Sequence, residues 1–512
     1  MIFQKILHSG KGSVKVFRTI FITGMAFCVN YGINLILTPF ITDNVGTEAY
    51  GFVSLAKQFA QYAMIITTAL NSFAARHIAV SYHKNEKREA NIFFSSVFYG
   101  DLGLGTVILT IALLCIFFLD KLINIPGSLV SDVKFLFLYI FINFWLVTVF
   151  NVFSVTAFIK NKLDLTGVYK GISYMTEAVV LLVIYVLFPA KVCYVGLGII
   201  AGTLVVAVTN KRICSKYTPD LVIKREFFSF KAVKRLVLDG IWTSVNSLGN
   251  LLNSGLDLIV CNLMLSSLEM GQLAIAKTIE SICHALYQLV AQAFQPSFLK
   301  SYADGDKKKL LSELRFSMKI CGMMSNLVFA GFYALGLAYY NLWIPNQDVV
   351  LIHRLTVITI MAGIASGLMY PLYYIYTLTV KKVVSCFVTL IGGLFNVLGM
   401  YILIKYFGWG VEAVVWTTVV VMTVINFVTN PLYMAHVLKF PKLIFFPNII
   451  RNLISCIALT IVFTFFAQFY MPQRWIALVL TILFYAVVGA AIHLLIVLDR
   501  DDWKKIRMIL KK

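Results

Sequence analysis

The chain has 512 residues, of which 60% are hydrophobic and 13% charged, whereas soluble domains average roughly 45–50% and about 25%. This composition excludes an ordinary water-soluble protein. The net charge of +21 would indicate a nucleic-acid partner in a soluble chain, so its distribution along the chain decides what it means.

Apolar stretches long enough to cross a bilayer follow one another along the whole chain, separated by short polar breaks. We therefore predict an all-α polytopic membrane protein with about fourteen transmembrane helices, an even number that leaves both termini on one side. The predicted spans are 17–40, 51–75, 92–119, 135–158, 171–189, 192–210, 236–262, 271–298, 317–340, 355–379, 383–404, 411–434, 449–470 and 475–497.

The basic residues are distributed unevenly between the two sides of these spans. If the amino terminus is cytoplasmic, the cytoplasmic segments together with the adjoining span ends hold 36 Lys and Arg and the outer loops six, while Lys57 and Lys277 fall deeper inside spans. By the positive-inside rule, both termini are expected in the cytoplasm. The basic segment 211–235 is expected to contact the anionic surface of the inner leaflet and not nucleic acid.

Few residues indicate catalysis, a cofactor or a metal. The nine cysteines include no Cys-x-x-Cys pair, which argues against a zinc site or a disulfide framework. Gly10 and Lys11 lack the glycine that a phosphate loop needs five residues earlier, where Lys5 stands. Segment 1–18 is basic and polar, so no cleavable signal peptide is expected. We predict a transporter and not an enzyme, without a cofactor or a metal.

An internal repeat relates the two halves of the chain. The segment Gly51–Lys57 aligns without gaps on Gly271–Lys277. Six spans separate the copies, so both enter the membrane in the same direction, as in a parallel pseudo-twofold repeat. The predicted domains are an N-lobe with spans 1–6 (1–210), a basic cytoplasmic linker (211–235), a C-lobe with spans 7–12 (236–435), and spans 13 and 14 with a basic tail (436–512).

Polar residues form stripes on the spans that the repeat pairs. Asn246, Asn250, Asn253 and Asp257 recur at spacings 4, 3 and 4, which is one face of a helix. Such stripes face a substrate cavity or join helices by hydrogen bonds. We take as substrate-cavity candidates Lys57, Gln61, Asn30, Asn34, Asn246, Asn250, Asn253, Lys277 and Gln288.

Two lysines at equivalent positions of the repeat are the main candidates for a functional role. Lys57 and Lys277 each lie six residues past a glycine at the outer edge of a span, or about 9 Å deep at 1.5 Å per residue. A lysine at this depth can snorkel to the outer surface. However, both lie near a helix amino terminus, where the helix dipole opposes a cation, and this favours a functional role.

Four ionisable residues inside spans are candidates for ion coupling: Asp257, Glu280, His284 and Asp101. The spacing of Lys277 and Glu280 allows an ion pair on one helix face. His284 suits either a proton-coupled cycle or a hydrogen-bonded core position. In the predicted span 355–379, Tyr370, Tyr373 and Tyr376 suit sugar stacking, although we favour an interfacial aromatic belt.

The arrangement of six plus six plus two spans resembles that of a known transporter family. Together with the run from Gly51 to Lys57 and the following Ala75, Arg76 and His77, it looks like the polysaccharide-transport branch of the multidrug/oligosaccharidyl-lipid/polysaccharide exporter superfamily. The O-antigen type oligosaccharide-lipid flippases are the nearest resemblance. It covers essentially the whole chain, but the family shares architecture more than sharp motifs.

The resemblance implies alternating access in the bacterial cytoplasmic (inner) membrane. The expected substrate is a polyprenyl-pyrophosphate-linked oligosaccharide for surface polysaccharide assembly of the O-antigen, lipopolysaccharide or capsule kind. An H+ or Na+ gradient or the membrane potential would drive it, and polysaccharide polymerase and glycosyltransferases would be partners. A multidrug cation antiporter of the same superfamily and a membrane glycosyltransferase or polymerase remain as alternatives.

Overall fold

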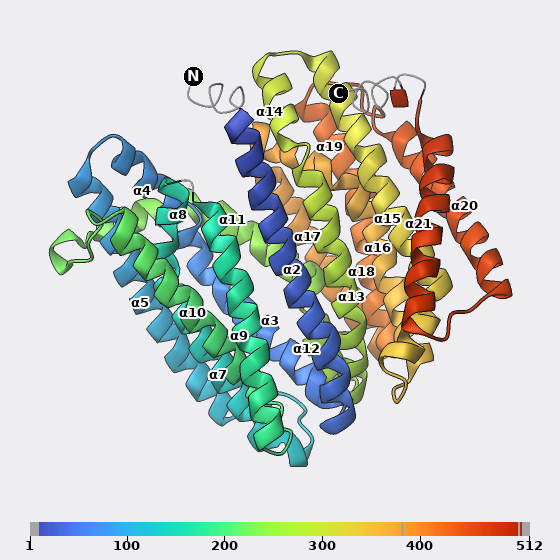
Figure 1. Ribbon diagram of the computed structural model, residues 1–512, viewed down its shortest axis with the longest axis horizontal. Coiled ribbons are helices and arrows are strands. Elements are labelled where there is room, and N and C mark those ends of the chain that lie inside the picture. Colours follow the sequence, from blue (N-terminus) through green and yellow to red (C-terminus); the bar gives the residue numbers. More distant parts are fainter. Residues whose placement is uncertain (1–9, 161, 380–382, 500–501, 504–512) are drawn as a thin grey trace. The chain divides into compact units, whose positions relative to one another are not determined.

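The computed structural model describes residues 10–160, 162–379, 383–499 and 502–503. In these residues every regular element is a helix. Each of the fourteen predicted spans corresponds to one long helix or to a helix continued after a short break, which confirms the all-α polytopic fold (Figure 1). Eleven of the described helices are long and apolar enough to cross a membrane.

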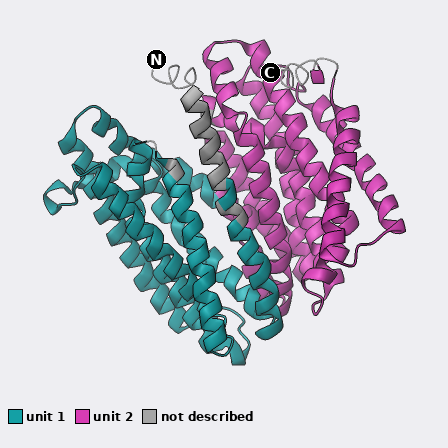
Figure 2. Cartoon of the chain, viewed as in Figure 1, with its two compact units in different colours: residues 1–248 teal, residues 249–512 magenta. Residues whose placement is uncertain are grey.

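The chain divides into two compact units, coloured separately in Figure 2: unit 1 is Met1–Leu248 and unit 2 is Gly249–Lys512. The longer helices of unit 1 are α2 (Gly10–Asn44), α3 (Thr47–Asn71), α5 (Lys87–Phe117), α7 (Val130–Phe150), α9 (Leu163–Leu187), α10 (Tyr194–Tyr217) and α11 (Phe230–Asn250). Short elements between them are α4 (Ala74–His83), α6 (Leu119–Leu122), η1 (Gly127–Leu129), η2 (Asn151–Ser154), α8 (Val155–Ile159) and η3 (Arg225–Phe227).

Unit 2 begins inside the last turn of α11, so one helix is shared by both units. Its elements are η4 (Leu251–Gly255), α12 (Asp257–Met264), α13 (Ser267–Gln292), α14 (Gln295–Ala303), α15 (Lys307–Trp343), α16 (Val349–Thr379), α17 (Val383–Phe407), α18 (Val411–Val424), η5 (Ile425–Thr429), α19 (Asn430–Val437), α20 (Phe446–Phe469) and α21 (Trp475–Val497).

The helix bounds repeat at the offset that the sequence indicates. The number of residues from the start of α3 to the start of α13 equals the number from the start of α5 to the start of α15. Lys57 and Lys277 are separated by the same number of residues. The turn before each of the later helices contains a left-handed residue at the same offset, Asn85 (φ 60°) and Gly305 (φ 71°). Glycine and asparagine are the residues that adopt this conformation most readily. The two segments therefore share backbone geometry as well as sequence.

Two π-helical turns interrupt the spans of unit 2. The turn η4 lies between α11 and α12, and η5 lies between α18 and α19. The predicted span 236–262 is therefore not one continuous α-helix. The extra residue of the π-turn rotates the side chains after it relative to those before it. Such turns occur often at functional sites.

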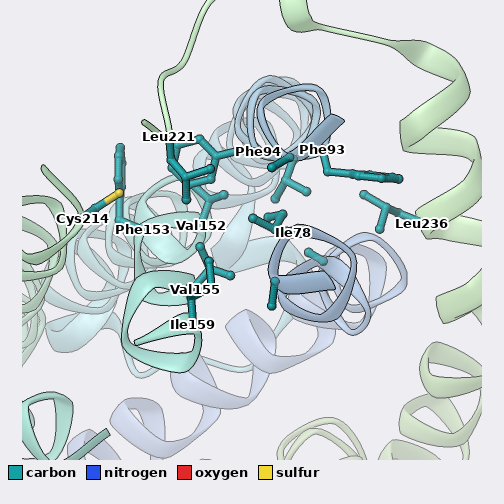
Figure 3. Packing of buried hydrophobic residues seen from close by; sticks show 14 of the residues in the cluster. Ile78, Phe93, Phe94, Val152, Phe153, Val155, Ile159, Cys214, Leu221 and Leu236 are labelled. Atoms are coloured by element: carbon teal, nitrogen blue, oxygen red, sulfur yellow. The ribbon is translucent and has the colours of Figure 1, made fainter. Parts of the chain in front are cut away.

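Buried apolar side chains hold each unit together. In unit 1, α4, α5, η2, α8 and α11 meet around Ile78, Phe94, Val152 and Leu236, and the chain after α10 adds Leu221 (Figure 3). In unit 2, a separate cluster of α15, α20 and α21 buries Phe463 and neighbouring residues. The last two spans are thus packed against α15.

Candidate substrate and ion-coupling site

A cluster of charged side chains is buried in unit 2, and we call Asp257, Lys277, Glu280 and His284 the Lys277 cluster. The Lys277 ammonium lies 2.5 Å from an Asp257 oxygen on α12 and 3.4 Å from a Glu280 oxygen on α13. The side chain of Asp257 is 1% exposed and that of Lys277 is 13% exposed. Asp257 reaches Lys277 because η4 ends directly before it and α12 packs against α13.

The Lys277 cluster has more negative than positive charge when His284 is neutral. One ammonium faces two carboxylates, and His284 Nε2 lies 3.6 Å from the second Glu280 oxygen. The net charge is then −1. Lys277 is therefore already paired with carboxylates and is not a free cation that could bind an anionic group.

The cluster continues through His284 to α16. His284 Nδ1 lies 3.3 Å from the Tyr370 hydroxyl. Farther along α16, Tyr373 and Tyr376 donate hydrogen bonds to Asn426 (2.5 Å) and Asn430 (2.8 Å). The hydroxyl groups of these tyrosines thus bond to η5 and α19, and the interfacial aromatic belt stays a prediction.

In unit 1 the equivalent lysine has no carboxylate within ion-pair distance among the described residues. Lys57 on α3 is half-buried and interacts electrostatically with Glu177 on α9. One lysine against one glutamate leaves this pair without net charge. The repeat therefore preserves the position of the lysine but not its number of carboxylate partners.

Asp101 does not join either lysine. It is fully buried on α5, where one carboxylate oxygen accepts a hydrogen bond of 2.7 Å from Asn71. Asn71 in turn accepts one of 3.2 Å from Asn151. The other carboxylate oxygen of Asp101 is buried without a hydrogen-bond partner among the described residues. This carboxyl group remains a candidate for ion coupling, separate from the lysines.

The predicted amide residues are not all placed alike. Asn34 donates to the Asn30 side chain on α2 at 2.8 Å, and both are half-buried, like Asn246 on α11. Asn253 is fully buried in η4 and donates to the Thr389 carbonyl of α17 at 2.6 Å, so it joins helices. The side chains that remain exposed within their own units are Gln61, Asn250 and Gln288.

Sequence reasoning missed two partners of the predicted residues. Glu177, whose position near the end of a span favours an interfacial location, interacts electrostatically with Lys57. The Tyr370 hydroxyl lies 3.3 Å from His284 Nδ1. An acid within the otherwise apolar span 171–189 was the available signal for Glu177. No signal existed for Tyr370, because 86 residues separate it from His284.

The described residues offer no group of three His, Cys, Asp or Glu side chains that could hold a metal ion. The carboxylates of the Lys277 cluster instead surround an ammonium group. What this arrangement can do chemically is to bind or release a proton or a small ion beside a buried lysine.

Comparison with known proteins identifies the class of this fold. The chain is similar to the solved structure of the lipid II flippase MurJ in an inward closed conformation (TM-score 0.66, 16% identity, 93% of this chain and 99% of that chain). It is also similar to an inward-facing multidrug resistance MATE family transporter of the MOP superfamily (TM-score 0.62, 16% identity, 81% and 99%). It is thus a multi-pass membrane protein with the fold of that superfamily.

The particular family follows from the sequence. Residues 16–301 match the family described as "Polysaccharide biosynthesis protein", and the chain belongs to this family. A curated relative, the "Uncharacterized membrane protein EpsK" of Bacillus subtilis (strain 168), is 26% identical over 435 residues, which cover 84% of this chain and 85% of the relative. The predicted resemblance to the polysaccharide branch of the superfamily is confirmed.

Proposed function

We propose that this protein is a flippase that moves a polyprenyl-pyrophosphate-linked oligosaccharide across the bacterial cytoplasmic membrane by alternating access. The observation that carries the proposal is membership of a polysaccharide biosynthesis family in a chain with the fold of MurJ, which is named a lipid II flippase. The glycan would serve a surface polysaccharide such as O-antigen or capsule.

The buried charges support coupling of transport to an ion gradient or to the membrane potential. The Lys277 cluster holds its ammonium between two carboxylates, so an anionic pyrophosphate can pair with Lys277 only after one negative charge is removed. Uptake of a proton neutralises it, either on a carboxylate or on His284, and a charged His284 would draw Glu280 away from Lys277. Binding of the pyrophosphate would then be linked to ion binding at the same place.

The experiment compares a deletion strain with strains carrying variants, and measures which leaflet holds the lipid-linked glycan by oxidation with membrane-impermeant periodate in spheroplasts. We expect the glycan to be accessible in the wild type and protected in the deletion strain. Lys57→Ala combined with Lys277→Ala should behave like the deletion at an unchanged protein level in the membrane.

A matched control is Lys307→Ala combined with Lys308→Ala, which removes two exposed lysines of α15 and should leave delivery unchanged. Normal glycan accessibility in the deletion strain would overturn the function. Normal accessibility in the strain lacking both Lys57 and Lys277 would overturn only the role of these lysines.

A second candidate is an exporter of cationic compounds. It is favoured by the net negative charge of the Lys277 cluster with neutral His284 and by the likeness to a MATE transporter. If the deletion strain delivers its glycan normally but accumulates ethidium severalfold above the wild type, this candidate replaces the first.

A further inference from the structure

The segment between α10 and α11 packs against α5 and is not a free linker. We call residues 218–229 the strap. It runs along the first turns of α5, where Asn91 donates to the Asp220 carbonyl (3.0 Å) and accepts from the Val222 amide (2.9 Å). One turn later, Ser95 contacts the Val222 carbonyl and the Lys224 amide, both at 3.2 Å.

The match between strap and helix has a simple geometric basis. Two residues of extended chain advance about 6.6 Å, and four residues of α-helix advance about 6 Å. Asn91 and Ser95 are four residues apart, so they meet the strap at every second residue. Ser96 closes the strap by bonding both the carbonyl and the amide of Ser229.

Alternate side chains of the strap consequently point in opposite directions. Leu221 is buried with Phe94 and Val152, and Ile223 packs against the same cluster (Figure 3). Val222 and Lys224 are exposed. The outward row continues in aromatic residues, because Phe228 is 45% exposed and Phe230, the first residue of α11, is 73% exposed.

Cations neighbour these exposed aromatic residues in the sequence. Arg225, Lys231 and Lys234 are all exposed, and among the described residues no carboxylate is within ion-pair distance of them. The two acids of the segment are engaged elsewhere, Glu226 with Lys224 (3.1 Å) and Asp220 with Lys87 (3.2 Å). The outward side therefore combines unpaired positive charge with apolar rings.

We propose that the strap and the first turn of α11 form a docking surface for anionic phospholipid headgroups. Helix α10 is long and apolar enough to cross a membrane and ends at Tyr217, directly before the strap, so the strap follows the end of a candidate membrane span. Phenylalanine rings enter the boundary between headgroups and acyl chains, and Lys and Arg attract anionic lipid there. The occupant is a lipid surface and not a soluble anion, because the exposed rings need an apolar phase.

The consequence of docking concerns the local stability of unit 1. The strap is held to α5 by hydrogen bonds from Asn91, Ser95 and Ser96 and by the burial of Leu221. These contacts are few compared with those inside a helix bundle, so the strap can open locally without unfolding the helices. Lipid that binds only the closed strap shifts this equilibrium toward the closed state. Anionic lipid should therefore stabilise the packing of the strap, which joins α10 to α11, on α5. This effect should not depend on the transported substrate.

The test is amide hydrogen exchange of the full chain in nanodiscs, made either of phosphatidylcholine alone or of two parts phosphatidylcholine to one part phosphatidylglycerol. We expect exchange in residues 218–229 to slow at least threefold with phosphatidylglycerol, and the effect to shrink at high NaCl concentration because salt screens the attraction. Phe230→Ala should weaken the effect, and Arg225→Gln with Lys231→Gln and Lys234→Gln should abolish it.

The matched control, Lys307→Gln with Lys308→Gln and Lys309→Gln, removes the same charge from exposed positions of α15. It should retain the slowing of the wild type. The proposal is overturned if phosphatidylglycerol leaves exchange in the strap unchanged, or if the control loses the effect as fully as the strap variant. A slowing that free glycerol phosphate reproduces would also overturn it, since the site would then bind a soluble anion.

Discussion

At the scale of single residues, the partners of a buried lysine decide what the lysine can bind. Lys277 has two carboxylates within 3.4 Å, whereas Lys57 has Glu177 as its electrostatic partner. The sequence treats the two lysines as equivalent, but Lys277 has two carboxylates within ion-pair distance and Lys57 has none among the described residues. Under the proposed function, binding of an anion in unit 2 would be linked to loss of a negative charge.

Removing that negative charge permanently should improve binding of an anionic group. For Glu280→Gln we expect about tenfold tighter binding of farnesyl pyrophosphate to the purified protein, or ~1.4 kcal/mol, because one carboxylate no longer competes for Lys277. Microscale thermophoresis in detergent measures the affinity. Glu412→Gln, which removes an exposed partner of Arg354, is the control; equal affinities of all three proteins would contradict the prediction.

How far the residues of the site could be predicted depends on their separation in the sequence. The pairing of Lys277 with Glu280 follows from a spacing of three on one helix. The contact with Asp257 needs the turn between α12 and α13, and the contact of His284 with Tyr370 needs the packing of α13 on α16. Periodicity carries no information on which helices become neighbours.

At the scale of elements, the first half of α11 is fixed closely against α3. A Cβ atom added at Gly240 would lie 2.0 Å from the Ala69 carbonyl oxygen, which cannot move away without shifting the backbone. Ser244 donates to the Ile65 carbonyl (2.9 Å), and Asp239 contacts His77 (2.8 Å). A small residue at 240 is thus required by the helix contact.

We expect Gly240→Ala to destabilise the protein by about 1–3 kcal/mol, the usual cost of overpacking. The measurement is thermal unfolding in detergent. Gly103→Ala on α5 is a suitable control, since its added Cβ would have no atom within 4 Å. A variant at 240 as stable as the control would show that α3 and α11 are not in close contact.

A buried ion pair ties the chain after α21 to α15. Lys319 is 3% exposed and donates to Asp499 (2.7 Å) and Asp502 (2.6 Å). The Lys319 hydrogen bond and the neighbouring Arg451 guanidinium lower the pKa of Asp499 below its ordinary value. His493 of α21 bonds Ser455 of α20 (2.8 Å) and the Lys319 carbonyl (3.1 Å).

This ion pair predicts a pH dependence of stability. Because the folded-state pKa of Asp499 is lowered, its contribution is fully present above the ordinary carboxyl pKa of about 4. It declines below that pH and is lost once the pH passes through the lower folded-state value. Asp499→Asn should therefore have a lower Tm than the wild type from pH 8 to about 5, and the difference should shrink as the pH falls below the ordinary carboxyl pKa of about 4.

The control for this series is Asp304→Asn, an exposed position in the turn before α15, which should show the wild-type curve. A difference between Asp499→Asn and the wild type that is constant down to pH 2.5 would contradict the assignment of the effect to the carboxylate.

The helices themselves were largely predictable, because long apolar runs between polar breaks leave no other structure possible in lipid. The irregular elements were not. The π-turns η4 and η5 have no distinctive composition in the sequence. The composition of the strap predicts only a basic linker, and its hydrogen bonds with Asn91, Ser95 and Ser96 are known only from the structure.

At the scale of the whole molecule, an even number of spans and the uneven distribution of Lys and Arg predict both termini in the cytoplasm. Green fluorescent protein fused after Lys512 should fluoresce, and alkaline phosphatase inserted after Lys191 or Arg474 should be active, since these positions fall in predicted outer loops. Phosphatase activity in a fusion at the carboxyl terminus would show that the predicted orientation is wrong.

The left-handed turns at Asn85 and Gly305 also limit which residues these two positions accept. Each turn needs a residue that tolerates a positive φ, and the chain places asparagine in one and glycine in the other. The carboxylates that interact with Lys57 and Lys277, in contrast, are not alike in the two segments. A substitution by a β-branched residue at 85 or 305 should therefore strain the backbone in both segments, whereas the ionic contacts can be changed in one segment without the other.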